Sequence, residues 1–200
     1  MTRYELIDPQ HPEPALVTVI GDRFASGQLG ILPTDTVYGI MGRSDAPSVS
    51  RRIYKAKRRD TAKHLQFLLA RLSQLDDLDI PLSAGLSKLA TAFWPGQLTV
   101  VARNRDNVGV GVRIPNHRLI FDVINHLGQP LVASSANLSG HDPAASPADD
   151  FRDLAEAPDF IVVGGTAAGT SSTVMCLESD RFEVLRCGSI SEAQIAAALA

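Results

Sequence analysis

The sequence predicts an α/β domain built around a mixed β-sheet. First, a chain of 200 residues fits one globular domain. Second, with 44% hydrophobic and 20% charged residues, the chain can bury a substantial core without disulfides or metals. Third, short apolar runs alternate with helical patterns along the middle of the chain and then follow one another near its end. We therefore expect one domain over residues 1–200, and an α+β arrangement with separate layers is the alternative.

Helices are predicted where apolar residues recur at helical spacing between a capping residue and a stop signal. Pro14 suits the first turn of the first helix, and Gly27 suits its C-cap. Asn116 and Gly128 bound the fourth helix, and Ser191 caps the last one. The predicted helices span residues 13–27, 46–57, 83–93, 116–128 and 191–200.

Short apolar runs between these helices predict buried strands, because they are rich in Val, Ile and Leu and are bounded by turn residues. The stretch 139–150 is rich in Pro, Ala, Ser and Asp, which predicts a long surface loop. The predicted strands lie within residues 29–34, 65–70, 97–104, 108–115, 130–135, 160–165, 171–177 and 181–187.

The charge and the cysteines narrow the class of protein. A formal net charge of −3 argues against a protein that coats nucleic acid with its whole surface. Cys176 and Cys187 form no metal-binding motif, so we expect reduced core thiols. The N-terminal segment has no apolar stretch typical of a secretory signal, and no apolar run approaches the ~20 residues that cross a bilayer. These features predict a soluble, cytoplasmic protein with no membrane contact.

Residues 51–63 read RRIYKAKRRDTAK and contain seven of the chain's nineteen Lys and Arg, with one acid, Asp60. Lys57 and Arg59 fall where the helix is expected to end, and cations on a loop beside a sheet are well suited to bind phosphate. The alternative is a solvated charged face, since cations are also favoured in the last turn of a helix. Four further cations are expected on the exposed sides of the helix: Arg51, Arg52, Lys55 and Arg58.

Two polar turns follow predicted strands. In LPTDTVYG, residues 32–39, the hydroxyls can bind a small polar ligand, or Thr34 and Asp35 can cap their own backbone. In PLVASSANLSG, residues 130–140, small polar side chains and backbone amides can form an anion-binding nest, or they can serve a helix cap or a β-turn. The polar side chains of the second turn are Ser134, Ser135 and Asn137.

Two arginines stand in or at the end of apolar strands. Arg113 lies between Val and Ile, and a buried arginine needs a carboxylate from the chain or from a ligand. Arg186 ends the last predicted strand. The Gly/Thr/Ser segment 164–173 has no lysine and is therefore no phosphate-binding P-loop, and the chain has neither a GxxxxGK[ST] nor a GxGxxG motif. The five histidines fall singly on different elements and predict no metal site.

Taken together and in this order, several segments resemble the YrdC-like family of threonylcarbamoyl-AMP synthases, in its short single-domain form. The segments are LPTDTVYG, KAKRRDTAKHL, FWPGQLTVV, VGVRIPNH, PLVASSANLSG, SSTV and VLRCG, from about Gly30 to about Gly188. The KxR and SxN signatures of the family correspond to Lys57 with Arg59 and to Ser135 with Asn137. The resemblance implies a twisted mixed α/β sheet flanked by helices, with a large basic cavity.

The resemblance also implies a function. Members of the family condense L-threonine, bicarbonate and ATP, with Mg²⁺, into threonylcarbamoyl-AMP and pyrophosphate, which is a nucleotidyltransferase reaction. The product feeds the synthesis of threonylcarbamoyladenosine in tRNA, so downstream tRNA threonylcarbamoyl-transfer proteins, and a contact with RNA, are the implied partners. The implied roles are catalysis for Lys57 and Arg59; ATP binding for Lys57, Arg59, Lys63, Ser135, Asn137 and Arg186; and threonine binding for Thr36, Arg113 and Ser172, with no metal ligand.

Several positions depart from the pattern of the family. Asp60 and His64 stand where proline is common, Leu68 stands where histidine is common, and Cys187 replaces a proline. Ala133 replaces a hydroxyl residue on the side expected to hold threonine. Two alternatives therefore stay open. One is an RNA-binding or ribosome-associated module without catalysis, and the other is a nucleotide-binding paralogue that uses a different small acid.

Overall fold

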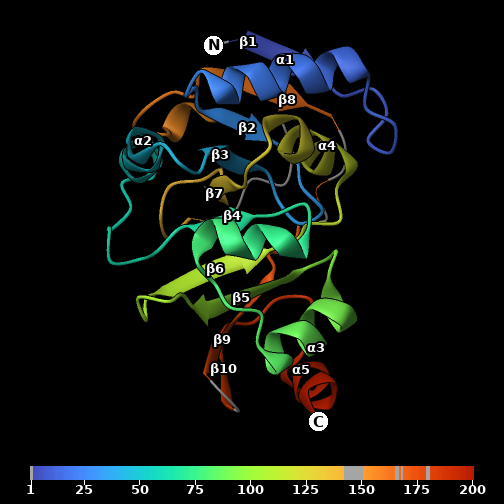
Figure 1. The fold of residues 1–200 in the computed structure, drawn as a ribbon. Coiled ribbons are helices and arrows are strands. Elements are labelled where there is room, and N and C mark those ends of the chain that lie inside the picture. Colours follow the sequence, from blue (N-terminus) through green and yellow to red (C-terminus); the bar gives the residue numbers. More distant parts are fainter. Residues whose placement is uncertain (1, 142–150, 165–166, 168, 179–180) are drawn as a thin grey trace.

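The computed structural model describes residues 2–141, 151–164, 167, 169–178 and 181–200. Within this part of the chain the strands form one mixed sheet, in the order β1-β8-β2-β3-β7-β4-β6-β5-β9-β10 (Figure 1). The strands are β1 (Thr2–Glu5), β2 (Gly30–Leu32), β3 (Gly39–Arg43), β4 (Gln66–Leu68), β5 (Leu98–Arg103), β6 (Gly109–Arg113), β7 (Leu131–Ser135), β8 (Phe160–Val163), β9 (Thr173–Glu178) and β10 (Arg181–Arg186).

The order of the strands brings distant parts of the sequence together. β8 lies between β1 and β2 and is parallel to both. The next three pairs in the sheet, β2 with β3, β3 with β7 and β7 with β4, are antiparallel. β4 pairs parallel with β6, β6 antiparallel with β5, and β5 parallel with β9. The mixed α/β sheet is therefore confirmed. Its central strands place the polar turns after β2 and β7 close to the start of β9.

All five predicted helices are present: α1 (Pro14–Ala25), α2 (Pro47–Lys57), α3 (Ala84–Phe93), α4 (Arg118–Leu127) and α5 (Glu192–Leu199). Gly128 ends α4 with a φ of 76°, and Ser191 caps α5 with a capping box. The predicted cap at Asn116 is wrong, because His117 is the N-cap of α4 and makes no side-chain cap bond. The Asn116 backbone N–H instead donates to Asp35 Oδ2 (3.1 Å).

The strands β1 and β3 were not predicted. The residues of β1 are mostly exposed, and they pair along one edge with β8 at the margin of the sheet. The strand β3 contains two glycines, which lower β-propensity, yet it pairs along its whole length with β7 and over Gly39–Met41 with β2. A Cβ on Gly42 would lie 2.6 Å from Val49 Cγ1 of α2, so this glycine allows the helix to approach the sheet. Both strands depend on partners far away in the sequence.

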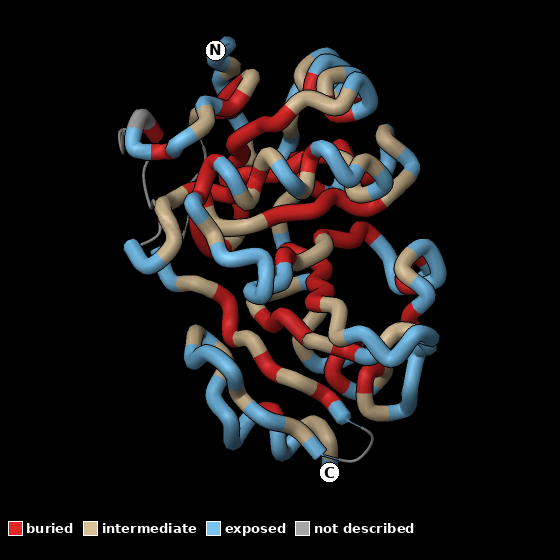
Figure 2. The backbone as a smooth tube through the Cα atoms, turned by 90° about the vertical axis from the view of Figure 1, so that its left-hand side faces the viewer, coloured by how far each residue is buried: buried red, intermediate tan, exposed pale blue. Residues whose placement is uncertain are grey.

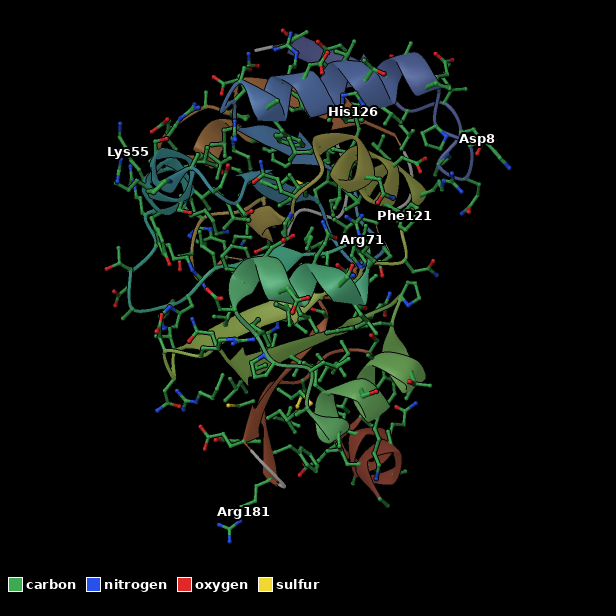
Figure 3. All side chains as sticks on the ribbon, viewed as in Figure 1. Asp8, Lys55, Arg71, Phe121, His126 and Arg181 are labelled. Atoms are coloured by element: carbon green, nitrogen blue, oxygen red, sulfur yellow. The ribbon has the colours of Figure 1, made fainter. Side chains whose placement is uncertain are left out.

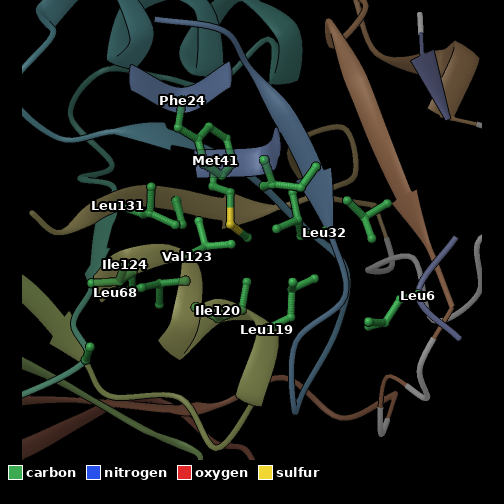
Figure 4. Close-up of a cluster of buried hydrophobic side chains, with 14 of the residues drawn as sticks. Leu6, Phe24, Leu32, Met41, Leu68, Leu119, Ile120, Val123, Ile124 and Leu131 are labelled. Carbon is green, nitrogen blue, oxygen red and sulfur yellow. The ribbon is translucent and has the colours of Figure 1, made fainter. Parts of the chain in front are cut away.

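Consecutive side chains of a strand point to opposite faces of the sheet. In the central strands the side chains of both faces are buried, because helices cover each face. One face packs against α1 and α4 through a cluster that includes Phe24, Met41 and Val123 (Figure 4). The other face packs against α2 through Ile40 and Ile53. Figure 2 shows the buried backbone running through the middle of the molecule. The helices α1 and α4 also meet at their surface, where His126 Nε2 lies 3.1 Å from Asp22 Oδ1 (Figure 3).

The strands β5, β9 and β10 are covered by helices on one face. There Leu89 of α3 and Ile195 of α5 pack in one cluster with Val100 and Met175 of the strands. The opposite face carries Thr99 and Val101, which alternate along β5 with Leu98 and Val100 and line a cavity. This face of β5, which α3 and α5 do not cover, therefore forms one wall of the candidate site.

Four further expectations concern the cysteines, the loop 139–150, membrane-spanning helices and the domain assignment. Both cysteines are free, but Cys187 is exposed, so the prediction that it is a core thiol is wrong. Its position directly after β10, at the margin of the sheet, explains the exposure. Of the predicted loop 139–150, residues 142–150 lie outside the described residues. None of the helices in the described part of the chain is long and apolar enough to cross a membrane. The assignment of residues 1–200 to one domain stays a prediction.

Candidate functional site

A cavity of about 290 Å³ lies against the uncovered face of the sheet. It is bounded by the loop before β3, the loop after α2, and residues of β4, β5, β6, β7, β9 and β10. Three arginines line it, and none of the described lining residues is an Asp or Glu. These arginines are Arg59, Arg113 and Arg186. The site is therefore cationic and offers hydrogen-bond donors to an anion.

Arg59 and Arg186 each reach the cavity while their backbones belong to different elements. Arg186 donates from Nε and Nη2 to the Ser172 carbonyl (3.2 and 2.8 Å) and from Nη2 to Ser172 Oγ (3.1 Å). Arg59 donates to the carbonyls of Lys63 (2.9 Å) and His64 (3.0 Å). Both Nη1 groups have no partner among the described residues. Burial, and then the positive charge of Arg59, lower the pKa of Arg186, so the pair is poised to receive negative charge.

The loop after α2 fixes the position of Arg59. The helix ends at Lys57, and Arg58 adopts the left-handed conformation (φ 47°, ψ 42°) as its C-cap. Asp60 Oδ1 then accepts a hydrogen bond from the Ala62 backbone N–H (2.9 Å), and the Asp60 carbonyl accepts one from the Lys63 N–H (3.0 Å). Asp60 therefore shapes the turn that carries Arg59, which is a structural role for this departure from the family pattern.

Lys57 does not point into the cavity. Its side chain is 1% exposed, and its Nζ donates to the carbonyls of Ser135 and Asn137, the latter at 2.5 Å. The side-chain oxygens Ser135 Oγ (3.4 Å) and Asn137 Oδ1 (3.3 Å) are also near Nζ. Burial, followed by the nearby charge of Arg59, lowers the pKa of Lys57 from 10.5 to about 7. The lysine of the KxR signature is thus bound to the turn of the SxN signature.

Arg113 finds its carboxylate within the chain. Its guanidinium, which is 2% exposed, donates to Asp35 Oδ1, to Thr36 Oγ1 (3.0 Å) and to the Gly96 carbonyl (2.8 Å). Burial lowers the pKa of Arg113, and Asp35 opposes that shift. Thr34 Oγ1 bonds to Thr36 Oγ1 (2.9 Å) and to the Val37 carbonyl (2.7 Å). The turn after β2 therefore caps its own backbone and also holds Arg113.

A chain of polar side chains connects β4 to Arg186. Thr99 Oγ1 donates to Gln66 Oε1 (3.0 Å) and lies 3.0 Å from Ser172 Oγ, which in turn accepts from Arg186. Gln66 and Thr99 both line the cavity, and neither was predicted as a site residue. A signal for Thr99 was present in its strand, where a hydroxyl alternates with buried Leu98 and Val100.

The structure places six of the nine predicted site residues around the cavity and three outside it. Those that line it are Thr36, Arg59, Arg113, Ser135, Ser172 and Arg186. Those that do not are Lys57, Lys63 and Asn137. Asn137 donates from Nδ2 to the carbonyls of Leu138 (2.9 Å) and His141 (2.6 Å), and Lys63 is exposed. Sequence reasoning missed His64 as a lining residue, whereas Ser134, which was named in the polar turn but received no role from the resemblance, lines the cavity beside Ser135.

The outer cations of α2 are not all solvated. Arg52 donates to Glu156 Oε1 (2.5 Å) and to Asp159 Oδ2 (2.7 Å), and Lys55 lies 3.3 Å from Glu156 Oε2. Figure 3 shows Lys55 at the outer edge of α2. The expectation of a solvated face is therefore wrong for Arg52, because acids before β8 neutralise it. Among the described residues, no group of three or more His, Cys, Asp or Glu could hold a metal ion.

The fold and the cavity define an α/β protein with an arginine-lined site against one face of a mixed sheet. The chain belongs to the Sua5/YciO/YrdC family, whose model, described as "Telomere recombination", matches residues 22–188.

The chain is similar to several relatives in this family. It is 34% identical to the threonylcarbamoyl-AMP synthase of Bacillus subtilis (strain 168), over 84% of this chain and 51% of that protein. It is 29% identical to the putative threonylcarbamoyl-AMP synthase of Mycobacterium tuberculosis (strain ATCC 25618 / H37Rv), over 98% of this chain and 94% of that protein. The chain therefore spans about half the length of the Bacillus relative and nearly the whole length of the mycobacterial one.

Two solved structures have the same fold. The Sua5 protein of P. abyssi complexed with L-threonine has a TM-score of 0.86 at 27% identity, over 98% of this chain and 60% of that one. E. coli YciO has a TM-score of 0.87 at 20% identity, over 98% of this chain and 100% of that one. The second likeness concerns the fold alone. The YrdC-like fold predicted from the sequence is thus confirmed.

Proposed function

We propose that the protein is a threonylcarbamoyl-AMP synthase, which condenses L-threonine, bicarbonate and ATP into threonylcarbamoyl-AMP, pyrophosphate and water. The observation that carries the proposal is the convergence of three arginines and several hydroxyls on one cavity, in a chain of the Sua5/YciO/YrdC family. The names of the Bacillus and mycobacterial relatives, and the threonine complex of P. abyssi Sua5, support it. The reaction is a nucleotidyl transfer.

In this proposal Arg59 and Arg186 bind the triphosphate of ATP. Their Nη1 groups, which have no partner among the described residues, supply donors. Burial, and then the charge of Arg59, lower the pKa of Arg186, and a phosphate between the two arginines would offset their repulsion. Ser135 lies at the same cavity and would bind the adenylate part. Lys63 is exposed on the loop beside Arg59 and would attract the triphosphate from solvent.

Threonine would occupy the end of the cavity near Arg113, Thr36 and Ser172. Arg113 has five N–H groups, and three of them are bound to Asp35, Thr36 and Gly96. The other two are available for the carboxylate of an amino acid. Asp35 orients the guanidinium in advance and keeps its charge compensated in the absence of a ligand.

The chemistry depends mainly on positioning. The amine of threonine attacks the carbon of bicarbonate, which loses water and gives a carbamate. A carbamate oxygen then attacks the α-phosphorus of ATP while the bond to the β-phosphate oxygen breaks, and pyrophosphate leaves. Negative charge grows on the leaving group, where Arg59 and Arg186 stabilise it. Bringing the reactants together supplies several kcal/mol of the barrier, on the order of that seen in intramolecular reactions. No side-chain nucleophile is required.

Mg²⁺ is expected to enter with ATP, on the phosphates. The described lining residues offer hydroxyls and guanidiniums but no carboxylate, which is the ligand type that Mg²⁺ prefers. Mg²⁺ bound to the phosphates would compensate charge on the departing pyrophosphate. In this proposal the product passes to the proteins that transfer the threonylcarbamoyl group to tRNA, and the reaction takes place in the cytoplasm.

One observation favours a second candidate, a paralogue that uses another small acid. Ala133 lines the cavity where a hydroxyl residue is common in the family, so the wall beside the amino acid is less polar. Leu68, the other departure on this side, is 2% exposed and belongs to the core, and it does not line the cavity. The two candidates share the ATP site and differ in the amino acid.

The test is pyrophosphate release from ATP, Mg²⁺ and bicarbonate with each amino acid in turn. We expect release that depends on L-threonine and falls by about a hundredfold in Arg59→Gln, which removes a charge that stabilises the leaving group. Release with another amino acid in place of threonine identifies the paralogue. A folded sample that releases no pyrophosphate with any amino acid rules out both, and RNA binding that falls steeply with salt then favours the non-catalytic module.

A further inference from the structure

The ammonium of Lys57 and the turn at residues 135–137 form a closed set of contacts. Two backbone carbonyls and two side-chain oxygens of the turn lie within 3.4 Å of Nζ, and Lys57 is not among the residues that line the cavity. We call these contacts the lysine clasp. The residues of the clasp are 78 and 80 positions away from Lys57 in the sequence, so the clasp joins the end of α2 to the end of β7.

The same turn is bound to α2 through the backbone. The Lys57 carbonyl accepts a hydrogen bond from the Ser139 N–H (3.0 Å). The Asn137 carboxamide is occupied within its own segment by the carbonyls of Leu138 and His141. Ser134, which precedes the clasp on β7, and Ser135, which belongs to it, both line the cavity. Ser135 therefore links the contacts of Lys57 to the wall of the cavity.

The charge of Lys57 agrees with a role in holding the turn. Since burial lowers the pKa of Lys57 to about 7, a neutral amine is well populated near neutral pH. A neutral amine keeps two N–H groups, which match the two carbonyls of Ser135 and Asn137, but it has little attraction for phosphate. Arg59 lines the cavity itself, and its guanidinium is a residue type suited to bind phosphate. The two residues of the KxR signature therefore differ in what they can do.

We propose that Lys57 is a positioning residue, which holds the 135–137 turn against α2 so that Ser134 and Ser135 face the cavity, and that Arg59 alone of the KxR pair contacts the anion. Where the proposal concerns ATP it rests on the proposed function. Where it concerns the turn it rests only on the clasp. Lys57 acts through the serines and does not touch the reacting atoms.

The experiment compares Lys57→Met, Lys57→Gln and Arg59→Gln. Amide hydrogen exchange is followed in the peptide 136–141 without ligand, and ATP affinity is measured separately. We expect Lys57→Met to speed exchange of this peptide by about tenfold or more and to weaken ATP binding by a similar factor, because the carbonyls of the turn lose their donor. Lys57→Gln carries a neutral NH₂ donor and should restore both properties in large part. Arg59→Gln should weaken ATP binding and leave the exchange unchanged.

The outcomes are decisive in either direction. Wild-type exchange of 136–141 in Lys57→Met overturns the proposal. So does a Lys57→Gln variant with a protected turn but lost ATP affinity, since that result assigns a direct role to the charge of Lys57. Failure of Lys57→Gln to restore protection also counts against it. If Lys57→Met does not fold, Lys57→Gln alone decides by the same criteria. If the wild type does not bind ATP, the proposed function fails, and the exchange result still decides whether the clasp holds the turn.

Discussion

Removing the charge of Asp35 tests how the buried guanidinium of Arg113 is stabilised. Asp35→Asn keeps a side chain of the same shape, and its Oδ1 can still accept from Arg113, but the guanidinium loses its buried counter-charge. The side chains of Arg113 and Asp35 are 2% and 10% exposed, so solvent screens their interaction weakly. We expect the free energy of unfolding to fall by about 3 kcal/mol, near the lower limit for breaking a buried ion pair, because Asn retains one acceptor.

The assay is urea unfolding, supported by the thermal midpoint. For a chain of this length, a loss of about 3 kcal/mol corresponds to a decrease of about 6 to 12 °C in the midpoint. Asp122→Asn is the matched control, since it removes the same charge from the exposed Arg118–Asp122 pair and should leave the midpoint almost unchanged. Equal midpoints for the two variants would refute the reasoning, because the buried pair would then contribute no more than a surface pair.

The same variant bears on the proposed threonine site. Without Asp35, the carboxylate of an amino acid becomes the available counter-charge for Arg113. We therefore expect saturating L-threonine to raise the midpoint of Asp35→Asn by more than it raises that of the wild type. A smaller increase in the variant would contradict the assignment of Arg113 to the carboxylate and would leave the stability result intact.

Three further predictions concern the basic segment and the polar side chains that line the cavity. Arg59→Gln should lower threonine-dependent pyrophosphate release about a hundredfold, because Arg59 lines the cavity. Arg51→Gln, on the exposed face of α2, should change mainly the salt dependence of the release. Equal losses in the two variants would contradict the division of the basic segment. The pKa of Lys57 is 10.5 in the unfolded chain and about 7 in the folded one, so between these pH values the unfolded chain binds one more proton. The free energy of unfolding should therefore rise with pH in this range. Urea titrations of Lys57→Met should lack the rise. Thr99→Val should leave Ser172 without its hydroxyl partner and weaken ATP binding about three- to tenfold by calorimetry, and an unchanged affinity would show that the polar chain does not position Arg186.

The helices could be predicted because their signals are local. Pro14 begins α1, and Gly128 and Ser191 mark the limits of α4 and α5, through bonds and dihedral angles that involve neighbouring residues only. The strand β3 escaped prediction for the opposite reason. Its two glycines carry a weak local preference, and it becomes a strand because β2 and β7 pair with it on both sides.

The site was predictable in its residue types and less so in its geometry. The need of Arg113 for a carboxylate followed from its position in an apolar strand, but the partner, Asp35, is 78 residues away. The same is true of Thr99, whose hydroxyl matters only because Gln66 and Ser172 lie on neighbouring strands. Such partners depend on the pairing of strands that are distant in the sequence.

Residues 51–63 illustrate both what could be predicted from the sequence and what depended on the tertiary structure. From the sequence alone came the concentration of charge, the end of the helix at Lys57, and the YrdC-like signatures, since composition and capping are properties of the chain itself. Only the tertiary structure directed Arg59 into the cavity, enclosed Lys57 beneath the 135–137 turn, and paired Arg52 with Glu156 and Asp159. The physical reason is that a cation takes the partners that folding brings within reach, and burial decides whether its charge is exposed, compensated or lost.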